Sequence, residues 1–96
     1  ENYYSLDFDP NKSILYSKDG EKKLTTKENA LLTLLVRNIN EVLDRQATLR
    51  AIWGDDNYFN GRSMDVYIAQ LRKLLSQDKT IEILNIHGVG FKLIIR

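Results

Sequence analysis

The stretch that decides the fold runs Arg62-Ser-Met-Asp-Val-Tyr-Ile-Ala-Gln-Leu-Arg-Lys-Leu-Leu75, and it is followed by His87-Gly-Val-Gly-Phe-Lys92. At about 100° per residue, four apolar side chains of the first stretch fall within a sector of roughly 60° on one side of a helix. These side chains are Met64, Ile68, Leu71 and Leu75. The glycines of the second stretch permit the tight reversal of a β-hairpin tip. The two stretches therefore predict an amphipathic helix followed by a glycine-tipped hairpin.

The opposite side of this helix carries a mixed set of side chains: Arg62, Val66, Ala69, Gln70 and Lys73. Arginine and lysine bind phosphates or guanine edges, glutamine pairs with adenine, and valine or alanine can meet a thymine methyl group. Such a set suits the major groove of DNA. Most amphipathic helices simply cover a core, however, so the helix alone leaves both interpretations open.

Length and composition point to one compact domain. Ninety-six residues with a hydrophobic fraction of 43% can form a single core but are too few for two domains. The absence of cysteine excludes disulfides and thiolate metal sites and fits a reducing, cytoplasmic location. No apolar run approaches the roughly 20 residues of a membrane span. Because Met64 is the only methionine, we expect the chain to be a piece of a longer protein that lacks its natural N-terminal neighbour.

Charge is unevenly distributed along the chain. Residues 62–96 contain six lysines and arginines against three acids, whereas residues 1–61 contain eight against ten. The more basic part coincides with the predicted helix and hairpin. This is modest support for a nucleic-acid partner, because charge clusters are usually just solvated faces.

The remaining elements can be placed by their turns and caps. Strands are predicted at Tyr3–Phe8, Ser13–Tyr16 and Lys22–Leu24, separated by turn residues. A capping box at Thr25–Glu28 predicts a helix over about 26–37. Asp44 can cap a second helix over 45–53, which Gly54 ends. The stretch 55–61 is expected to be a loop, and the chain is expected to close with strands at 81–86 and 91–95.

These motifs together resemble one family. A three-stranded start leads into Leu24-Thr-Thr-Lys-Glu28, and Ile52-Trp-Gly54, Arg62-Ser-Met-Asp-Val-Tyr-Ile68, Leu71-Arg-Lys73 and Gly88-Val-Gly-Phe91 follow in order. From about Leu6 to Ile94 this order is similar to that of the effector domains of OmpR/PhoB-type response regulators. Within the family the motifs are most similar to those of RprY-like regulators. The expected fold class is α+β: a winged helix-turn-helix with an N-terminal antiparallel sheet, three helices and a C-terminal β-hairpin wing.

The resemblance implies a transcription regulator that binds double-stranded promoter DNA. In the family, a sensor kinase phosphorylates an N-terminal receiver domain, which is absent from this chain, and effector domains pair head to tail on DNA. We expect the isolated domain to be monomeric. The resemblance assigns DNA contact to Trp53, Arg62, Ser63, Val66, Tyr67, Ala69, Gln70, Arg72, Lys73, Asn85, His87 and Lys92. Its loop for RNA polymerase falls within Gly54–Gly61 and comprises Asp55, Asp56, Asn57, Tyr58, Phe59 and Asn60.

Several of these assignments have an alternative. Arg72 either binds phosphate or is held by an acidic neighbour such as Asp65. The indole of Trp53 either reaches a phosphate or only fills the core. His87 either contacts DNA or is a surface hydrogen-bonding residue. The polymerase loop can equally be an ordinary connection, and the whole domain can be a protein-interaction module whose contact with DNA is incidental.

The chain departs from the family pattern in two places. Strong base readers of the family often have two adjacent basic residues where this chain has Ala69-Gln70, which should lower affinity and favour adenine. The residue before the first wing glycine is commonly arginine, whereas His87 is mostly uncharged at neutral pH. Both departures predict a less basic DNA reader than is common in the family.

Catalytic and metal-binding functions are not indicated. Asp55 and Asp56 are adjacent in a loop without metal-ligand spacing nearby, and Ser63 has no relay partner in the sequence pattern. No cofactor is expected, and the chain is not expected to be an enzyme.

Overall fold

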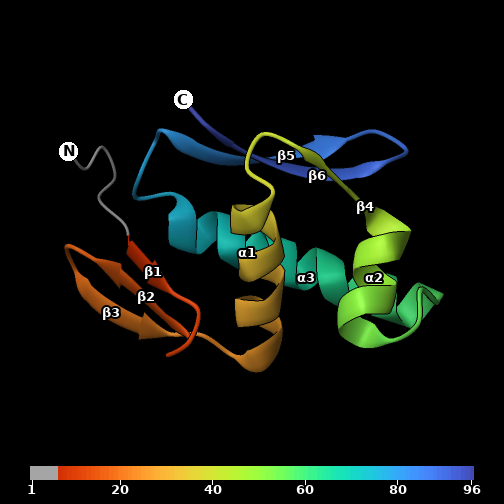
Figure 1. The fold of residues 1–96 in the computed structure, drawn as a ribbon, viewed down its shortest axis with the longest axis horizontal. Coiled ribbons are helices and arrows are strands. Elements are labelled where there is room, and N and C mark those ends of the chain that lie inside the picture. Colours follow the sequence, from red (N-terminus) through yellow and green to blue (C-terminus); the bar gives the residue numbers. More distant parts are fainter. Residues whose placement is uncertain (1–6) are drawn as a thin grey trace.

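The computed structural model describes residues 7–96, and its two antiparallel sheets lie on either side of a set of three helices (Figure 1). Strands β1 (Asp7–Asp9), β2 (Ile14–Ser17) and β3 (Gly20–Lys23) form the N-terminal sheet in the order β1-β2-β3. The second sheet has the order β4-β6-β5 and consists of β4 (Val42–Asp44), β5 (Ile81–Ile86) and β6 (Gly90–Ile95). Helix α1 (Thr26–Arg37) connects the two sheets, and α2 (Arg45–Trp53) and α3 (Tyr58–Leu75) lie between β4 and β5 in the chain. The predicted α+β winged-helix class is confirmed.

The predicted helix bounds are correct for α1 and α2. The Glu28 amide donates to Thr25 Oγ1 at 3.2 Å, and the Thr25 amide donates to Glu28 Oε1 at 2.8 Å, which closes the predicted capping box. Asp44 caps α2 by accepting from the Ala47 amide at 2.9 Å. Gly54 ends α2 with a left-handed backbone at φ 82°.

Helix α3 begins four residues before the predicted start at Arg62. Asn57 is its N-cap, because the Asn60 amide donates to Asn57 Oδ1 at 2.9 Å. The first turn of α3 therefore takes up Tyr58, Phe59 and Asn60, which the sequence analysis placed in the loop. Gly61, expected to end that loop, is buried inside the helix.

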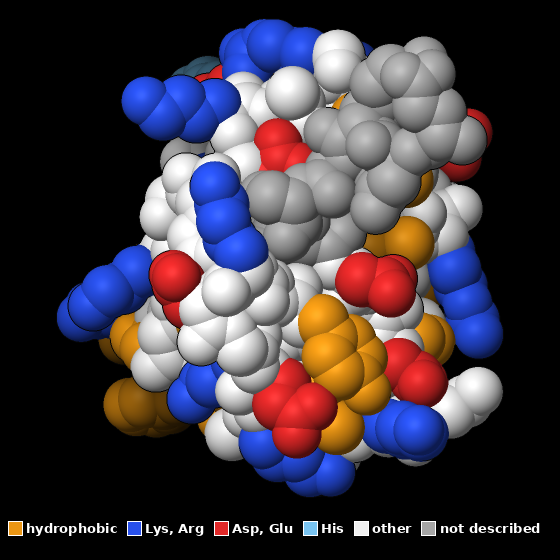
Figure 2. All heavy atoms as spheres, turned by 90° about the vertical axis from the view of Figure 1, so that its left-hand side faces the viewer, with side chains coloured by type: hydrophobic (Ala, Val, Ile, Leu, Met, Phe, Trp, Pro, Cys, Tyr) orange, Lys and Arg blue, Asp and Glu red, His pale blue; other side chains and the backbone are white. Residues whose placement is uncertain are grey.

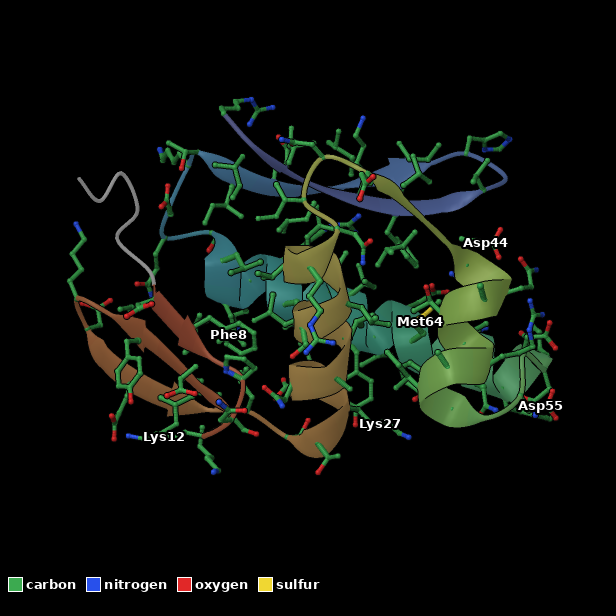
Figure 3. All side chains as sticks on the ribbon, viewed as in Figure 1. Phe8, Lys12, Lys27, Asp44, Asp55 and Met64 are labelled. Atoms are coloured by element: carbon green, nitrogen blue, oxygen red, sulfur yellow. The ribbon has the colours of Figure 1, made fainter. Side chains whose placement is uncertain are left out.

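The core lies between α1, α3 and the second sheet. Met64, Ile68, Leu71 and Leu75 of α3 are all buried, as their spacing predicts. Figure 3 shows Met64 in the interior of the molecule, and it belongs to the same core cluster as the buried leucines of α1. Burial of one face fixes the rotation of α3 and leaves the opposite face exposed.

Strand β4 was not predicted. Its three residues pair antiparallel with β6, with Val42 opposite Lys92, Leu43 opposite Phe91 and Asp44 opposite Gly90. The pairing makes β6 the central strand of the second sheet and ties the start of α2 directly to the hairpin.

The predicted N-terminal strands need smaller corrections. Residues 3–6 of the first predicted strand lie outside the described part of the chain, and β1 extends to Asp9. The third strand begins at Gly20 and ends at Lys23, before Leu24. Leu24 is buried, and its amide donates to the Ser13 carbonyl at 2.7 Å. Within residues 7–96, no helix is both long and apolar enough to cross a membrane.

Candidate nucleic-acid interface

The exposed face of α3 presents the side chains that the sequence analysis placed there. Arg62, Val66, Ala69, Gln70 and Lys73 are all exposed. Val66 is 56% exposed, although it is hydrophobic. An exposed row of two cations, an amide and two small apolar groups is chemically suited to the edges and phosphates of a DNA major groove.

Arg62 is held in place by its own helix. Its Nη1 donates to the hydroxyl of Tyr58 at 3.0 Å, and its guanidinium lies 5.8 Å from the centre of the Tyr58 ring. Ser63, the other residue expected at the start of the groove helix, is half-buried. The guanidinium of Arg62 stays at the surface, where a phosphate can reach it.

Trp53 and Tyr67 form a partly buried aromatic pair between the end of α2 and the middle of α3. Their ring centres are 5.8 Å apart and the rings are tilted by 58°. Lys27 lies 5.2 Å from the Trp53 ring and donates to the Ile52 carbonyl at 2.9 Å. Both rings pack against the core and remain partly exposed. The structure therefore shows the core-packing role of Trp53, and its contact with a phosphate stays a prediction.

Arg72 is bound to the hairpin and not to an acidic residue. Its Nε donates to the Ile83 carbonyl at 3.0 Å, and its Nη2 donates to Asn85 Oδ1 at 2.8 Å. Asp65, the acidic neighbour considered above, is instead paired with Arg45. The structure thus joins two of the predicted DNA contacts, Arg72 and Asn85, across the space between α3 and β5.

A polar groove separates α3 from the hairpin. It has a volume of about 540 Å³, and its lining includes Arg45, Asp65, Arg72, Asn85 and His87. His87 is exposed in the turn between β5 and β6, at the end of the molecule opposite the N-terminal sheet (Figure 1). The groove brings Arg45, Asn85 and His87, from distant parts of the chain, beside α3. This is the geometry that a helix and a wing need in order to contact one duplex.

Lys92 does not lie in this groove. Its neighbours on β6, Phe91 and Leu93, are buried toward the helices, and side chains alternate between the two faces of a strand. Lys92 therefore lies on the outer face of the second sheet, across from Val42 and Leu84.

Arg45 is a member of this site that the sequence analysis missed. Its guanidinium donates to both carboxylate oxygens of Asp65, at 2.7 and 3.2 Å, and to the Gly61 carbonyl at 3.0 Å. Twenty residues separate Arg45 from Asp65 in the chain, so no local pattern could have revealed the pair.

The predicted polymerase loop is divided between a short connection and the first turn of α3. Asp56 pairs with Arg50 at 2.8 Å, and the Asn60 amide group donates to the Asp55 carbonyl at 3.0 Å. Tyr58 and Phe59 are 68% and 79% exposed and meet edge to face, with ring centres 5.7 Å apart. Figure 3 shows Asp55 at the end of the molecule farthest from the N-terminal sheet.

Charge elsewhere on the molecule is mixed. The end that carries the N-terminal sheet shows basic and acidic side chains side by side (Figure 2). Among residues 7–96, no group of three or more acidic or histidine side chains lies close enough together to hold a metal ion.

Comparison with known proteins identifies the family. Residues 19–93 match the family described as "Transcriptional regulatory protein, C terminal". The chain is 60% identical over 87 residues to the transcriptional regulatory protein RprY of Bacteroides fragilis, which bears out the resemblance to RprY-like regulators. The match covers 91% of this chain but only 37% of RprY, so the chain spans little more than a third of that relative.

Solved structures share the fold. The DNA-binding domain of CpxR from E. coli superposes with a TM-score of 0.80 at 22% identity, covering 95% of this chain and 91% of that one. The DNA-binding domain of Klebsiella pneumoniae RstA, in complex with the RstA box, gives 0.75 at 25% identity, covering 97% and 98%. This is a family of transcription regulators and not of enzymes. The chain belongs to it, as a winged-helix effector domain of the OmpR/PhoB type of response regulator.

Proposed function

We propose that this domain binds double-stranded promoter DNA sequence-specifically, with α3 in the major groove and the β5–β6 hairpin near the adjacent minor groove. The observation that carries the proposal is the exposed row Arg62, Val66, Ala69, Gln70 and Lys73, which lies on one face of α3 beside the wing. A helix of this kind presents its side chains to base edges while neighbouring elements contact the phosphates.

Within this proposal the residues have different tasks. Arg62, Ser63 and Lys73 contact phosphates, Val66, Ala69 and Gln70 face bases, and Tyr67 lies at their edge. Trp53 contributes its exposed indole edge from the end of α2. Arg72 and Asn85 are hydrogen-bonded to each other, so we expect them to contact one phosphate together. His87, in the turn of the wing, lies nearest to the minor groove.

The proposed assembly follows the family. Two copies bind a direct repeat head to tail, and the isolated domain is monomeric. In the whole regulator, a sensor kinase acts on a receiver domain that precedes this one. Because the proposed ligand is promoter DNA, we propose that the domain acts in the cytoplasm.

A second surface favours contact with RNA polymerase. Tyr58 and Phe59 are the most exposed large hydrophobic side chains of the described residues, and their rings meet edge to face, close in the chain to the acidic pair Asp55 and Asp56. Exposed aromatic groups beside charged residues are typical of protein-protein contacts. The surface lies at the start of α3, so a bound polymerase would approach the duplex from the side of α2.

An NMR titration of the isotope-labelled chain with a direct-repeat duplex tests the DNA proposal. We expect amide shifts over 62–73 and 85–92 that weaken as salt rises. A duplex of unrelated sequence should give smaller shifts in the same places. Shifts confined to 55–61, or none with any duplex, would favour a protein-interaction module instead.

A further inference from the structure

Among the described residues, the ion pair of Arg45 with Asp65 takes no part in the DNA contacts proposed above. We propose that Arg45 is a positioning residue that sets the spacing between the recognition helix α3 and the wing, and that Asp65 is its anchor on α3. This inference rests on the proposed mode of DNA binding, in which one duplex must meet both elements.

Arg45 is joined to the wing through its backbone. It is the first residue of α2, and its amide donates to the Val89 carbonyl in the hairpin turn at 2.9 Å. The first amides of a helix have no partner within the helix, so the wing turn supplies one. Gly90 makes the approach possible, since a Cβ there would overlap the Leu43 carbonyl and lie 2.9 Å from the Arg45 nitrogen.

The side chain of Arg45 reaches α3 in the other direction. The two hydrogen bonds to Asp65 form a bidentate pair, which fixes orientation as well as distance. The third bond, to the Gly61 carbonyl, is possible because Gly61 has no side chain: a Cβ would lie 3.1 Å from Arg45 Nη2. The guanidinium also lies 5.8 Å from the centre of the Phe91 ring on β6. One residue therefore links α2, the wing and the N-terminal half of α3.

The chemistry of the pair argues against Arg45 as a phosphate ligand. Three of its donor positions are used within the protein, and its charge is balanced by a carboxylate 2.7 Å away. Asp65 itself is 52% exposed on the DNA-facing helix, where a bare carboxylate would repel phosphates. Arg45 both holds the helix and neutralises that charge.

Arg72 supplies a second tie near the end of α3, through Ile83 and Asn85 of β5. With α3 tied to the hairpin near both ends, the polar groove between them keeps a constant width. The Arg45 tie is the one nearer the wing tip, because it joins Val89 to residues 61 and 65.

The test has two measurements on the whole 96-residue chain. The first compares affinity for a full site and for the same site trimmed on the wing side, so that the wing loses its minor groove. For Arg45→Lys and Asp65→Asn we expect the full-to-trimmed affinity ratio to fall by about 3–10-fold, because a bidentate pair is lost. Arg50→Lys, from the other α2 ion pair, and Glu82→Gln, from the ion pair with Arg96, are matched controls that should leave the ratio unchanged.

This ratio separates positioning from the simpler roles. If a variant is only less stable, or if Arg45 only binds phosphate, the affinity for the full and the trimmed duplex falls by the same factor. An Asp65 that only repels DNA would make Asp65→Asn bind both duplexes more tightly. Any of these results, with the ratio unchanged, overturns the proposal.

The second measurement needs no DNA, so it remains informative if the domain does not bind DNA. Because the chain contains no cysteine, spin labels can be attached uniquely at Val89→Cys and Gln77→Cys. We expect the distance distribution between wing tip and helix end to broaden or shift in Asp65→Asn and to stay unchanged in Glu82→Gln. An unchanged distribution in Asp65→Asn would show that the pair does not position the wing.

Discussion

At the scale of single residues, Gln70 and Arg62 share one exposed face of α3 but offer DNA different chemistry. The glutamine amide can donate to and accept from adenine in two parallel hydrogen bonds. The guanidinium of Arg62 is held by the Tyr58 hydroxyl, and we propose that it contacts a DNA phosphate. The spacing of the buried residues predicted the exposure of both side chains. The bond between Arg62 and Tyr58 was not predicted, because Tyr58 was placed in a loop.

The two residues should therefore differ in what their loss changes. Gln70→Ala should relax base preference at one position by about 1–3 kcal/mol, while Arg62→Ala should weaken all sequences alike and reduce the salt slope by about 1. Affinity measured on a set of sites with each base pair replaced in turn distinguishes these effects. Gln77→Ala, exposed beyond the end of α3, is the control. A uniform loss for both α3 variants would mean that Gln70 is not a base reader.

At the scale of elements, helices with local start and stop signals could be predicted from the sequence. Thr25 with Glu28 and Asp44 with Gly54 act through atoms only a few residues away, so α1 and α2 have the expected bounds. The predicted start of α3 at Arg62 was too late, because the polar stretch 55–61 has the composition of a loop. Gly61 lies inside the helix that Asn57 caps, and its carbonyl accepts a hydrogen bond from the Arg45 guanidinium, a contact made across the fold.

Strand β4 could not be predicted for the same reason. Three residues carry too little pattern of their own, and their pairing partner is almost fifty residues away on β6. The residues that line the polar groove differ in the same way. The sequence predicted Arg72 of α3 as a site residue through its family motif, but it did not predict Arg45, which the tertiary fold brings into the groove.

The junction of β4 and β6 makes Gly90 the most sensitive glycine of the wing. Gly90→Ala should lower the free energy of unfolding by about 3 kcal/mol, because the new methyl group would overlap the Leu43 carbonyl. Gly88→Ala should cost only about 1–2 kcal/mol, since its φ of 74° is strained for alanine but no atom lies within 4 Å. Urea unfolding of both variants measures the difference, and equal losses would contradict the close approach.

At the scale of the whole molecule, few positively charged side chains among residues 7–96 of the domain are free to contact DNA phosphates. Its formal net charge is +1, and Arg45, Arg50 and Arg96 are each paired with an acid. The cations proposed for contact are Arg62, Arg72, Lys73 and Lys92, of which Lys92 lies on the far face of its sheet. A single copy should therefore bind weakly, and a stable complex should require two copies.

Salt dependence measures this directly. On a half-site, the logarithm of the binding constant should fall with the logarithm of salt concentration with a slope of about −3, and on a direct repeat the slope should roughly double. Fluorescence anisotropy on both duplexes gives the two slopes. A half-site slope of about −6 or steeper would show that many more cations contact phosphate than these positions supply.

The strand order β4-β6-β5 also bears on how the domain is made in the cell. Of the elements that the structure describes, β6 is synthesised last, yet it lies between β4 and β5 and is paired with the residues just before α2. While β6 is still inside the ribosome, the wing has no second strand and Arg45 has no Val89 beside it. The surface proposed to read DNA is thus completed only after β6 has emerged, so we expect a nascent chain that lacks β6 not to bind a promoter.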